Sequence, residues 1–316
     1  MTSDATPAAP LSIGSVERET GLSKDTLRIW ERRYGFPQPG RDAFGERIYA
    51  LEDVRKLQLL KRLIDIGHRP GKIVDRNIEE LQALAQGIAR TALPLRIEDG
   101  EREELQHYLD LCKTHRFEEF RRMLSQDLLR LGLFGCVVNI IAPLNHIVGR
   151  HWANGSLAVF EEHLYTESVQ IVLRNAIAAV PRPHGGAGRP RVLLTTFPQE
   201  QHGLGLLMAE AIFALEGASC ISLGVQTPII EISRAAETQH ADIVALSFSS
   251  AMNGNQALEG LRDLRAGLKP DTEIWIGGGC AVLARRPPPG IVVLDLSDVA
   301  AQLGEWYRRR NPHDPH

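Results

Sequence analysis

The residues after position 190 alternate between short apolar runs and segments with helical spacing. The apolar runs read RVLLTTF, ASCISLG, DIVALSFSS, EIWIGGG and GIVVLDL. Continuous apolar runs of this length, separated by helices, are typical of parallel strands that are covered on both faces. The pattern predicts a doubly wound α/β domain over residues 191–310. A stretch rich in Pro and Gly precedes it and predicts a linker over residues 182–190.

The 316 residues of the chain are enough for two or three domains. Residues 1–10 are polar and rich in Ala and Pro, which predicts a disordered leader. Residues 11–80 contain short helical patterns separated by Gly and Pro. A helix followed by a loop then predicts a linker over residues 81–100. The apolar spacing is helical throughout residues 101–181, which predicts a bundle of helices.

Composition argues against several classes of protein. With 36 Lys and Arg against 39 Asp and Glu, no overall charge favours a nucleic acid or a membrane, so either partner would need a local patch. The start of the chain lacks the basic and apolar regions of a signal peptide. The most apolar helix is too short for a convincing membrane span, and it is interrupted by Asn139, Pro143, Asn145 and His146.

The four cysteines lie far apart and lack CxxC spacing: Cys112, Cys136, Cys220 and Cys280. This spacing predicts reduced core residues rather than disulfides or a zinc site. Together with the absence of a membrane signal, it predicts a soluble, cytoplasmic protein with no membrane partner.

The segment IGSVERETGLSKDTLRIWERRYGF has the pattern of a helix, a tight turn and a second helix. Gly21 ends the first helix, Ser23 caps the second, and Asp25 sits favourably in its first turn. This spacing matches a helix-turn-helix, whose second helix enters the major groove of DNA. Between positions 11 and 76 there are 14 Lys and Arg against 10 Asp and Glu, a modest excess that does not decide the matter alone.

The stretches LSIGSVERETGLSKDTLRIWERRYG, RIYALEDV and LLKRLIDIGH resemble the MerR family of transcriptional regulators over about 65 residues. The resemblance implies a winged helix-turn-helix that binds double-stranded promoter DNA. It also implies contacts with phosphates or base edges from the recognition helix and the wing, by Arg28, Arg32, Arg33, Tyr34, Arg41, Arg47 and Tyr49. The forked donors of guanidinium groups suit both targets. Any exposed helix can carry such arginines, so the whole pattern indicates DNA binding; Leu27 and Trp30 are predicted core residues.

The loop TTFPQEQHGLG follows the first predicted strand of the C-terminal domain. His202 therefore lies at the carboxyl end of a strand, where doubly wound folds bind ligands. Glu200 is close enough to hydrogen-bond one imidazole nitrogen and leave the other for a metal. Gly203 and Gly205 remove side chains where a bulky ligand would press on the backbone. A histidine here is more often an ordinary loop residue, but these neighbours favour a metal-binding loop with a large flat partner.

The spacing ExHxxG resembles the cobalamin-binding signature DxHxxG, with Glu200 in place of the aspartate. The resemblance implies a flavodoxin-like domain in which His202 displaces dimethylbenzimidazole from the lower face of cobalt, and the displaced tail lies in a channel beside the sheet. LGVQTP, SFS and GGG follow the next three strands, as in that family. The resemblance implies that Ser247 hydrogen-bonds the tail while Gly277 and Gly278 let it pass, and that Ser249 also belongs to the cofactor-binding residues. The family usually has Ser-x-Leu where this chain has SFS.

Trp152, Glu162 and His163 resemble the W-x9-EH motif in the four-helix cap of CarH-type photoreceptors. The resemblance implies that Trp152 packs on the 5′-deoxyadenosyl group above cobalt, with the Glu-His pair nearby. An indole suits this role because it offers apolar area and a stacking face. The alternative is a core tryptophan followed by a helix whose N-terminus is favoured by Glu161 and Glu162.

The chain departs from this family at Ala153, where CarH-type proteins carry a histidine that ligates cobalt after illumination. Alanine has no atom that can serve as a ligand. His146 and His151 are nearby histidines, but adjacent positions on a helix face different ways.

Together the patterns predict an all-α winged helix-turn-helix module, a four-helix bundle cap and a flavodoxin-like doubly wound parallel sheet. The predicted function is that of a light-responsive transcriptional repressor, without enzymatic activity. Adenosylcobalamin would control a homo-oligomer, either a dimer or a tetramer, that binds DNA through several modules at once. Methylcobalamin and hydroxocobalamin are the other forms considered. The alternatives are a corrinoid methyl carrier of a methyltransferase system and a MerR-type regulator for which cobalamin is dispensable.

Overall fold

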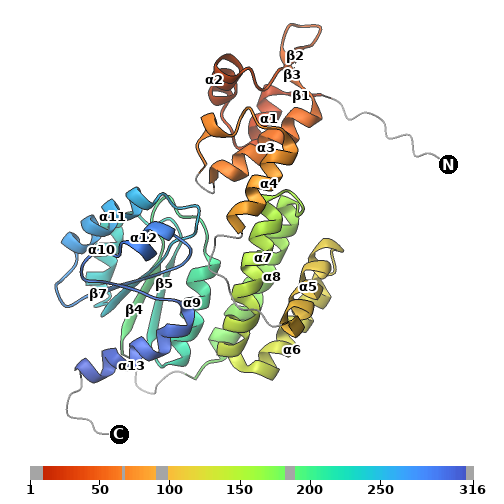
Figure 1. Cartoon of the computed structure of the whole chain (residues 1–316). Helices are drawn as coiled ribbons and strands as arrows, with labels where there is room; N and C mark the ends of the chain where they lie inside the picture. Colours follow the sequence, from red (N-terminus) through yellow and green to blue (C-terminus); the bar gives the residue numbers. More distant parts are fainter. Residues whose placement is uncertain (1–9, 66–67, 90–98, 182–188, 311–316) are drawn as a thin grey trace. The chain divides into compact units, whose positions relative to one another are not determined.

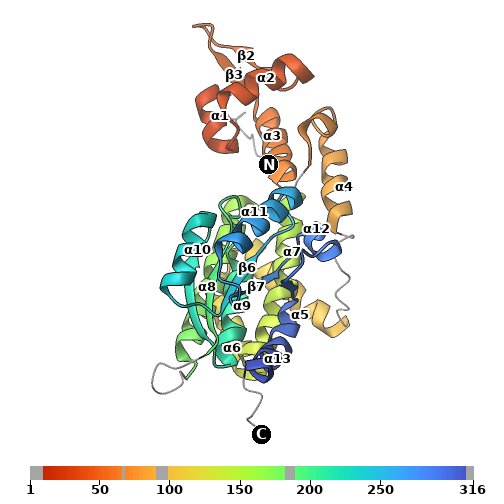
Figure 2. The same ribbon diagram turned by 90° about the vertical axis from the view of Figure 1, so that its left-hand side faces the viewer.

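The computed structural model describes residues 10–65, 68–89, 99–181 and 189–310. The chain forms two compact units. One comprises Met1–Pro94 and Arg150–Leu157, and the other comprises Leu95–Gly149 and Ala158–His316. Figures 1 and 2 show the elements of each unit. Most of the predicted leader and most of the predicted 182–190 linker lie outside the described residues.

The N-terminal unit has the predicted winged helix-turn-helix. Its helices are α1 (Ile13–Thr20), α2 (Lys24–Tyr34), α3 (Leu51–Asp65), the short 3-10 helix η1 (Pro70–Lys72) and α4 (Ile78–Ala89). A small antiparallel sheet of order β1-β3-β2 forms the wing and its base, from β1 (Leu11–Ser12), β2 (Gly40–Arg41) and β3 (Arg47–Tyr49). Helix α4 covers residues 81–89 of the predicted 81–100 linker, where Leu81 is buried in the core of this unit, and residues 90–98 lie outside the described residues.

The helix ends form for the predicted reasons. Gly21 follows α1 with a left-handed φ of 69°, which only glycine adopts readily. The Ser23 hydroxyl accepts a hydrogen bond from the Thr26 N–H at 3.1 Å and so caps α2. Leu27 and Trp30 are buried in the core of the unit, as predicted.

The second unit begins with helices α5 (Asp99–Lys113), α6 (Phe117–Gly135), the π-helix η2 (Cys136–Ile141), α7 (Ala142–Ala153) and α8 (Val159–Ala179). The last residues of α7, from Arg150, belong to the first unit. Its core is aromatic: the Phe120 ring centroid lies 5.1 Å from that of Tyr108 and 5.8 Å from that of Tyr165. The prediction that the most apolar helix is too short for a membrane span is wrong in length: of the described helices, the continuous stretch Phe117–Ala153 alone has the length and hydropathy of a span. A buried core helix passes the same test. All four cysteines carry free thiols.

The C-terminal part of this unit is a five-stranded parallel sheet of order β5-β4-β6-β7-β8. Its strands are β4 (Arg191–Thr195), β5 (Ser219–Gly224), β6 (Ile243–Ser247), β7 (Glu273–Gly277) and β8 (Ile291–Val293). The helices around it are α9 (Leu204–Leu215), α10 (Ile229–Thr238), α11 (Gly254–Gly267), α12 (Ala281–Arg285), the 3-10 helix η3 (Leu296–Asp298) and α13 (Val299–Arg310).

This arrangement is the predicted doubly wound, flavodoxin-like sheet (Figure 1). Helix α9 packs against α6 and α8 of the bundle, and α10 packs against α11. The strand order reverses between β4 and β6, which are neighbours in the sheet. The loops that follow these two strands therefore lie at the topological switch point, where open α/β sheets bind ligands.

Candidate functional site

The loop between β4 and α9 places a buried carboxylate beside a histidine. The side chain of Glu200 is only 2% exposed. Ionised side chains are seldom buried so completely unless they have partners, and Glu200 has them. Its Oε1 accepts a hydrogen bond from His202 Nδ1 at 2.6 Å and another from the His202 backbone N–H at 2.9 Å. This is the contact that the two-residue spacing predicted.

The second oxygen of Glu200 joins this loop to the loop after β6. Glu200 Oε2 accepts hydrogen bonds from the Ser249 backbone N–H and from the Ser249 hydroxyl, each at 2.7 Å. Burial raises the pKa of Glu200, but the hydrogen bonds from His202 and Ser249 outweigh it and leave the pKa lowered. Glu200 is therefore a carboxylate at neutral pH, and the structure gives the Ser249 hydroxyl a protein partner.

These contacts orient the imidazole of His202. Because Nδ1 is bonded to Glu200, a bond from this ring to a metal would be made by Nε2. The side chain of His202 is half exposed, whereas its carboxylate partner is buried. A carboxylate-oriented imidazole at the edge of a sheet is the kind of donor that fits a cobalt ion carried in a corrin ring.

The glycines of the signature are explained by contacts within the protein. A Cβ on Gly205 would lie 2.6 Å from Ser247 Oγ, and one on Gly203 would lie 3.1 Å from the Val225 side chain. Gly278 has a φ of +105°, and a Cβ there would lie 2.2 Å from the carbonyl oxygen of Phe248. The sequence predicts that these glycines make room for a ligand, but the Phe248 backbone already requires Gly278, and a side chain at position 205 would displace the Ser247 hydroxyl.

Gly277 is less constrained than its neighbour. A Cβ on Gly277 would lie 3.1 Å from the carbonyl oxygen of Leu294, so a small shift could accommodate it. Ser247 ends β6 and places its hydroxyl against α9, at the space that Gly205 leaves open. A role for Ser247, Gly277 and Gly278 toward a cofactor tail stays a prediction.

Trp152 belongs with the N-terminal unit rather than with the helical bundle. Arg62 Nη1 in α3 donates a hydrogen bond to the Trp152 carbonyl oxygen at 2.7 Å, and the guanidinium lies over the indole, 5.3 Å from the ring centroid. Burial lowers the pKa of Arg62, and the neighbouring Ala153 is buried in the same core. Arg62 lies in the LLKRLIDIGH stretch that resembles the MerR family, but no sequence pattern predicted its contact with Trp152.

The other two residues of the W-x9-EH motif lie in the second unit. Glu162 accepts a hydrogen bond from the Thr166 hydroxyl at 2.8 Å, and the side chain of His163 is 71% exposed. Because Trp152 is in the other unit, the grouping of the three residues around a ligand stays a prediction. Glu161 has the helix-capping role of the alternative interpretation: one of its oxygens accepts the Ala158 N–H at 2.6 Å, and the other pairs with His115 at 2.9 Å.

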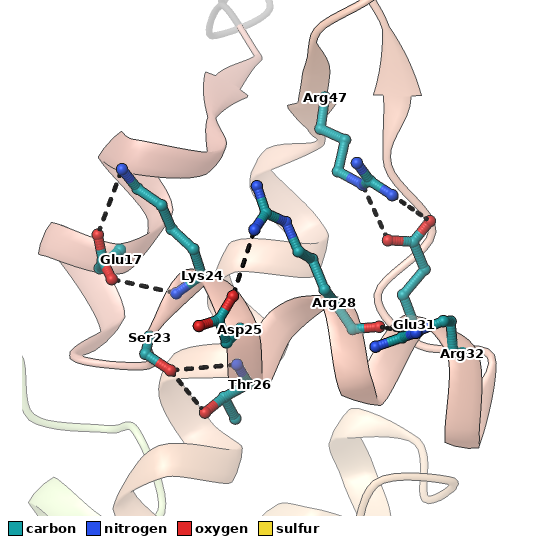
Figure 3. Close-up of polar contacts among 9 residues, drawn as sticks. All are labelled: Glu17, Ser23, Lys24, Asp25, Thr26, Arg28, Glu31, Arg32 and Arg47. Carbon is teal, nitrogen blue, oxygen red and sulfur yellow. Dashed lines mark hydrogen bonds and ion pairs between the residues drawn. The ribbon is translucent and has the colours of Figure 1, made fainter.

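The arginines of the recognition helix α2 contact residues that are close to them in the sequence (Figure 3). Arg28 pairs with Asp25 at 3.2 Å and keeps about half of its side chain exposed. Arg32 Nε donates to the Arg28 carbonyl oxygen at 3.3 Å, and the guanidinium of Arg33 lies over the Tyr34 ring at 5.3 Å. These weak, exposed contacts can be exchanged for phosphate or base contacts at little cost.

The wing is fastened to the recognition helix by an ion pair. Arg47 Nε donates to Glu31 Oε2 at 2.9 Å, and both side chains are about 30% exposed (Figure 3). The hydrogen bond and the charge of Glu31 raise the pKa of Arg47. Arg41 Nη1 donates to the Gly45 carbonyl oxygen at 2.6 Å, so both wing arginines have partners within the protein.

Tyr49 does not lie on the surface of the wing. It is fully buried in the core that contains Val16 and Trp30, and its hydroxyl has no hydrogen-bond partner among the described residues. Burial raises the pKa of Tyr49. A side chain enclosed in this way cannot reach a phosphate or a base, so Tyr49 is removed from the predicted DNA interface.

Comparison with known proteins identifies a family for the N-terminal part of the chain and another for the C-terminal part. Residues 11–75 match the MerR HTH family of regulatory proteins, and residues 190–294 match the B12 binding domain. The chain is 31% identical over 269 residues to the HTH-type transcriptional repressor CarH of Myxococcus xanthus, covering 83% of this chain and 86% of CarH. It is 29% identical over 260 residues to the repressor CarA of the same organism, covering 81% and 83% of the two chains.

Among solved structures, the monomethylamine corrinoid protein of Methanosarcina barkeri aligns with 63% of this chain and 96% of its own, at a TM-score of 0.50 and 12% identity. At that identity the likeness concerns the fold alone. The relatives with higher identity are transcriptional regulators rather than enzymes.

Proposed function

Because this chain belongs to the CarH family of MerR-type transcriptional regulators, we propose that it represses a promoter under the control of adenosylcobalamin. The observation that carries the proposal is the buried carboxylate of Glu200, which holds His202 on one oxygen and Ser249 on the other. The four hydrogen bonds that this carboxylate accepts hold the two loops in a fixed arrangement. Here the carboxylate positions an imidazole at the ligand-binding edge of the sheet.

His202 is proposed as the lower ligand, acting through Nε2. When bound, cobalamin supplies a metal whose lower face accepts an imidazole and whose upper bond to carbon is broken by light. Glu200 fixes the tautomer with the proton on Nδ1 and makes the imidazole a better donor. The Ser247 hydroxyl, at the end of β6, is proposed to bind the displaced tail, with Gly277 and Gly278 beside its path.

Trp152, Glu162 and His163 are proposed to enclose the adenosyl group. The indole would supply the apolar face, and methyl or hydroxo forms would leave that face without a partner. Ala153 has no donor atom and is only 5% exposed, so position 153 cannot ligate cobalt after illumination. His151 already has Ser156 Oγ 2.7 Å from its Nδ1. We therefore propose a light response that is reversed when fresh adenosylcobalamin is added. The reason is that Ala153 cannot form a bond to cobalt that would stabilise the illuminated state.

DNA binding is assigned to the N-terminal unit, through Arg28, Arg32, Arg33 and Tyr34 of α2 and through Arg41 and Arg47 of the wing. One such module makes a small interface, so operator affinity is proposed to come from a cytoplasmic dimer or tetramer that engages several modules at once. The cofactor would favour that oligomer in the dark. A methyl carrier would use the sheet domain in the same way, but it would leave a complete MerR module without a role.

The proposal is tested by loading the full-length protein with adenosylcobalamin in darkness and desalting it. The absorption spectrum, the oligomer size and the retardation of a promoter duplex are then measured before and after green light. We expect a coloured protein that retards DNA in the dark and releases it in the light. A colourless protein would contradict cobalamin binding, and a bound methyl form that is turned over by a methyl acceptor would support the methyl carrier instead.

A further inference from the structure

The tip of the wing carries a large apolar side chain in open solvent. Phe44 is 92% exposed, the largest fraction for any large apolar residue in the described part of the chain. Single exposed apolar residues are common on protein surfaces and need no explanation by themselves. Phe44 differs because hydrogen bonds order the backbone of the turn that carries it.

Five hydrogen bonds order the turn between β2 and β3. Asp42 Oδ1 accepts the backbone N–H groups of Phe44 and Glu46, each at 2.9 Å. The Gly45 N–H donates to the Asp42 carbonyl oxygen at 3.0 Å, and the Asp42 N–H donates to the Glu46 carbonyl oxygen, also at 3.0 Å. The Gly45 carbonyl oxygen receives the Arg41 guanidinium at 2.6 Å. Such a turn holds the backbone of Phe44 at a fixed position, so little backbone order remains to be imposed when a partner binds.

The tip is also tied to the recognition helix. Pairing of Gly40 with Ile48 and of Arg41 with Arg47 carries the turn to the base of the wing. There, Arg47 is bonded to Glu31 of α2. The position of Phe44 is therefore set by the same helix that is proposed to enter the major groove.

Charge does not explain what the tip would do at DNA. Residues 40–47 carry two arginines and two acidic residues, so the wing has no net charge. Both arginines are bonded within the protein, so the DNA contacts proposed for them require these bonds to be exchanged, and Asp42 at the tip would repel a phosphate. What the tip offers to a partner is the aromatic ring.

We propose that Phe44 enters the minor groove next to the base pairs that α2 reads and wedges against one base step. The inference rests on the proposed DNA binding. Apolar side chains in other proteins unstack a base step in this way and bend the duplex. Pyrimidine–purine steps such as TA and CA yield most easily, so the wedge selects for such a step at a fixed distance from the major-groove contacts.

The test uses the cofactor-loaded, full-length protein and a duplex that this protein selects from a random pool. The duplex carries 2-aminopurine at successive positions, because the fluorescence of this base rises when it is unstacked. Four proteins are compared: the unaltered protein, Phe44→Ala, Phe44→Leu, and Leu129→Ala as a control that removes a similarly exposed apolar residue on α6. Affinity is measured over a range of salt concentrations.

We expect the unaltered protein and Leu129→Ala to raise the fluorescence at one step and to bind equally well. Phe44→Ala should lose the rise and bind about tenfold more weakly, with the same salt dependence, whereas Phe44→Leu should keep part of both effects. Arg28→Ala, by contrast, should reduce the slope of log affinity against log salt concentration by about one, because one phosphate contact is lost.

Equal affinity and fluorescence for Phe44→Ala and the unaltered protein would overturn the wedge while leaving DNA binding in place. A loss of affinity for Phe44→Ala with a flatter salt dependence would also overturn it, because that pattern indicates a phosphate contact. Failure of the unaltered protein to retain any duplex would overturn the proposed function itself.

Discussion

Glu200 and Ser249 are joined by two hydrogen bonds of 2.7 Å, from the backbone N–H and the hydroxyl of Ser249 to the same carboxylate oxygen. The two residues follow β4 and β6, the pair of strands at which the order of the sheet reverses. The contact therefore links the histidine loop to the neighbouring strand of the site. It gives Glu200 a second function besides orienting His202.

Removal of the Ser249 hydroxyl tests this link. Ser249→Ala keeps the backbone hydrogen bond but removes one of the four that Glu200 accepts from His202 and Ser249. We expect the unfolding free energy to fall by about 1–3 kcal/mol and cofactor affinity to fall by about tenfold. Urea titration and equilibrium dialysis with adenosylcobalamin measure the two effects. Ser250→Ala, an exposed neighbour in the same loop, should change neither, and equal losses in both variants would count against the link.

The lowered pKa of Glu200 predicts a pH dependence with a definite sign. A carboxyl group whose pKa is lower in the folded protein stabilises the fold above its unfolded-state pKa of about 4.3 and loses that contribution as the pH falls through the folded-state pKa. Glu200→Gln should thus be less stable than the unaltered protein at pH 7, with the difference shrinking in acid. Urea titrations of both proteins at pH 7 and at pH 4 or below measure it; a difference that is constant with pH would contradict the assignment.

Arg62 should hold the Trp152 segment on the N-terminal unit. Arg62→Ala removes the hydrogen bond to the Trp152 carbonyl oxygen and the guanidinium above the indole. Because a hydrogen bond from a charged group is worth about 1.5–3 kcal/mol, hydrogen exchange in residues 150–157 should speed up by at least about tenfold. Exchange around His202 should be unchanged. Arg55→Ala, an exposed arginine on the same helix, is the control, and unaltered exchange in Arg62→Ala would remove the proposed role.

Tyr49 should be dispensable for DNA binding. Its hydroxyl is buried without a partner among the described residues, so Tyr49→Phe removes an unsatisfied polar group and keeps the ring that fills the core. We expect the melting temperature to stay the same or rise, with a gain of up to about 1 kcal/mol, and operator affinity to stay unchanged. Arg28→Ala in the same retardation assay should bind more weakly. Weaker DNA binding by Tyr49→Phe would return this residue to the interface.

The fold follows from patterns that are local in the sequence. Gly21 and Ser23 end and begin helices through contacts with residues three or four positions away, and these rules need no tertiary structure. The apolar runs define the strands of the sheet in the same way. Glu200 and His202 are two residues apart, so their hydrogen bond could also be predicted.

The contacts that the sequence did not reveal join distant positions. Ser249 lies 49 residues from Glu200, and Trp152 lies 90 residues from Arg62. No spacing rule connects such pairs, because they meet only when the domain is folded. Gly205 shows a related difficulty: its signature position indicates a ligand, whereas in the structure a side chain at this position would collide with the Ser247 hydroxyl. Tyr49 was misassigned because its position in the wing does not reveal whether the side chain points into the core or toward solvent.

The central claim is that His202 Nε2 bonds to the cobalt of a bound corrin. Its most direct test is the electron paramagnetic resonance spectrum of the protein loaded with cob(II)alamin, after growth with histidine labelled with ¹⁵N. The account predicts that the nitrogen splitting changes from three lines to two on labelling, and that the two-line pattern is lost in His202→Ala but kept in His107→Ala, which alters an exposed histidine on α5. Three lines that persist in the labelled protein would mean that the cofactor's own base holds the metal, and they would contradict the claim.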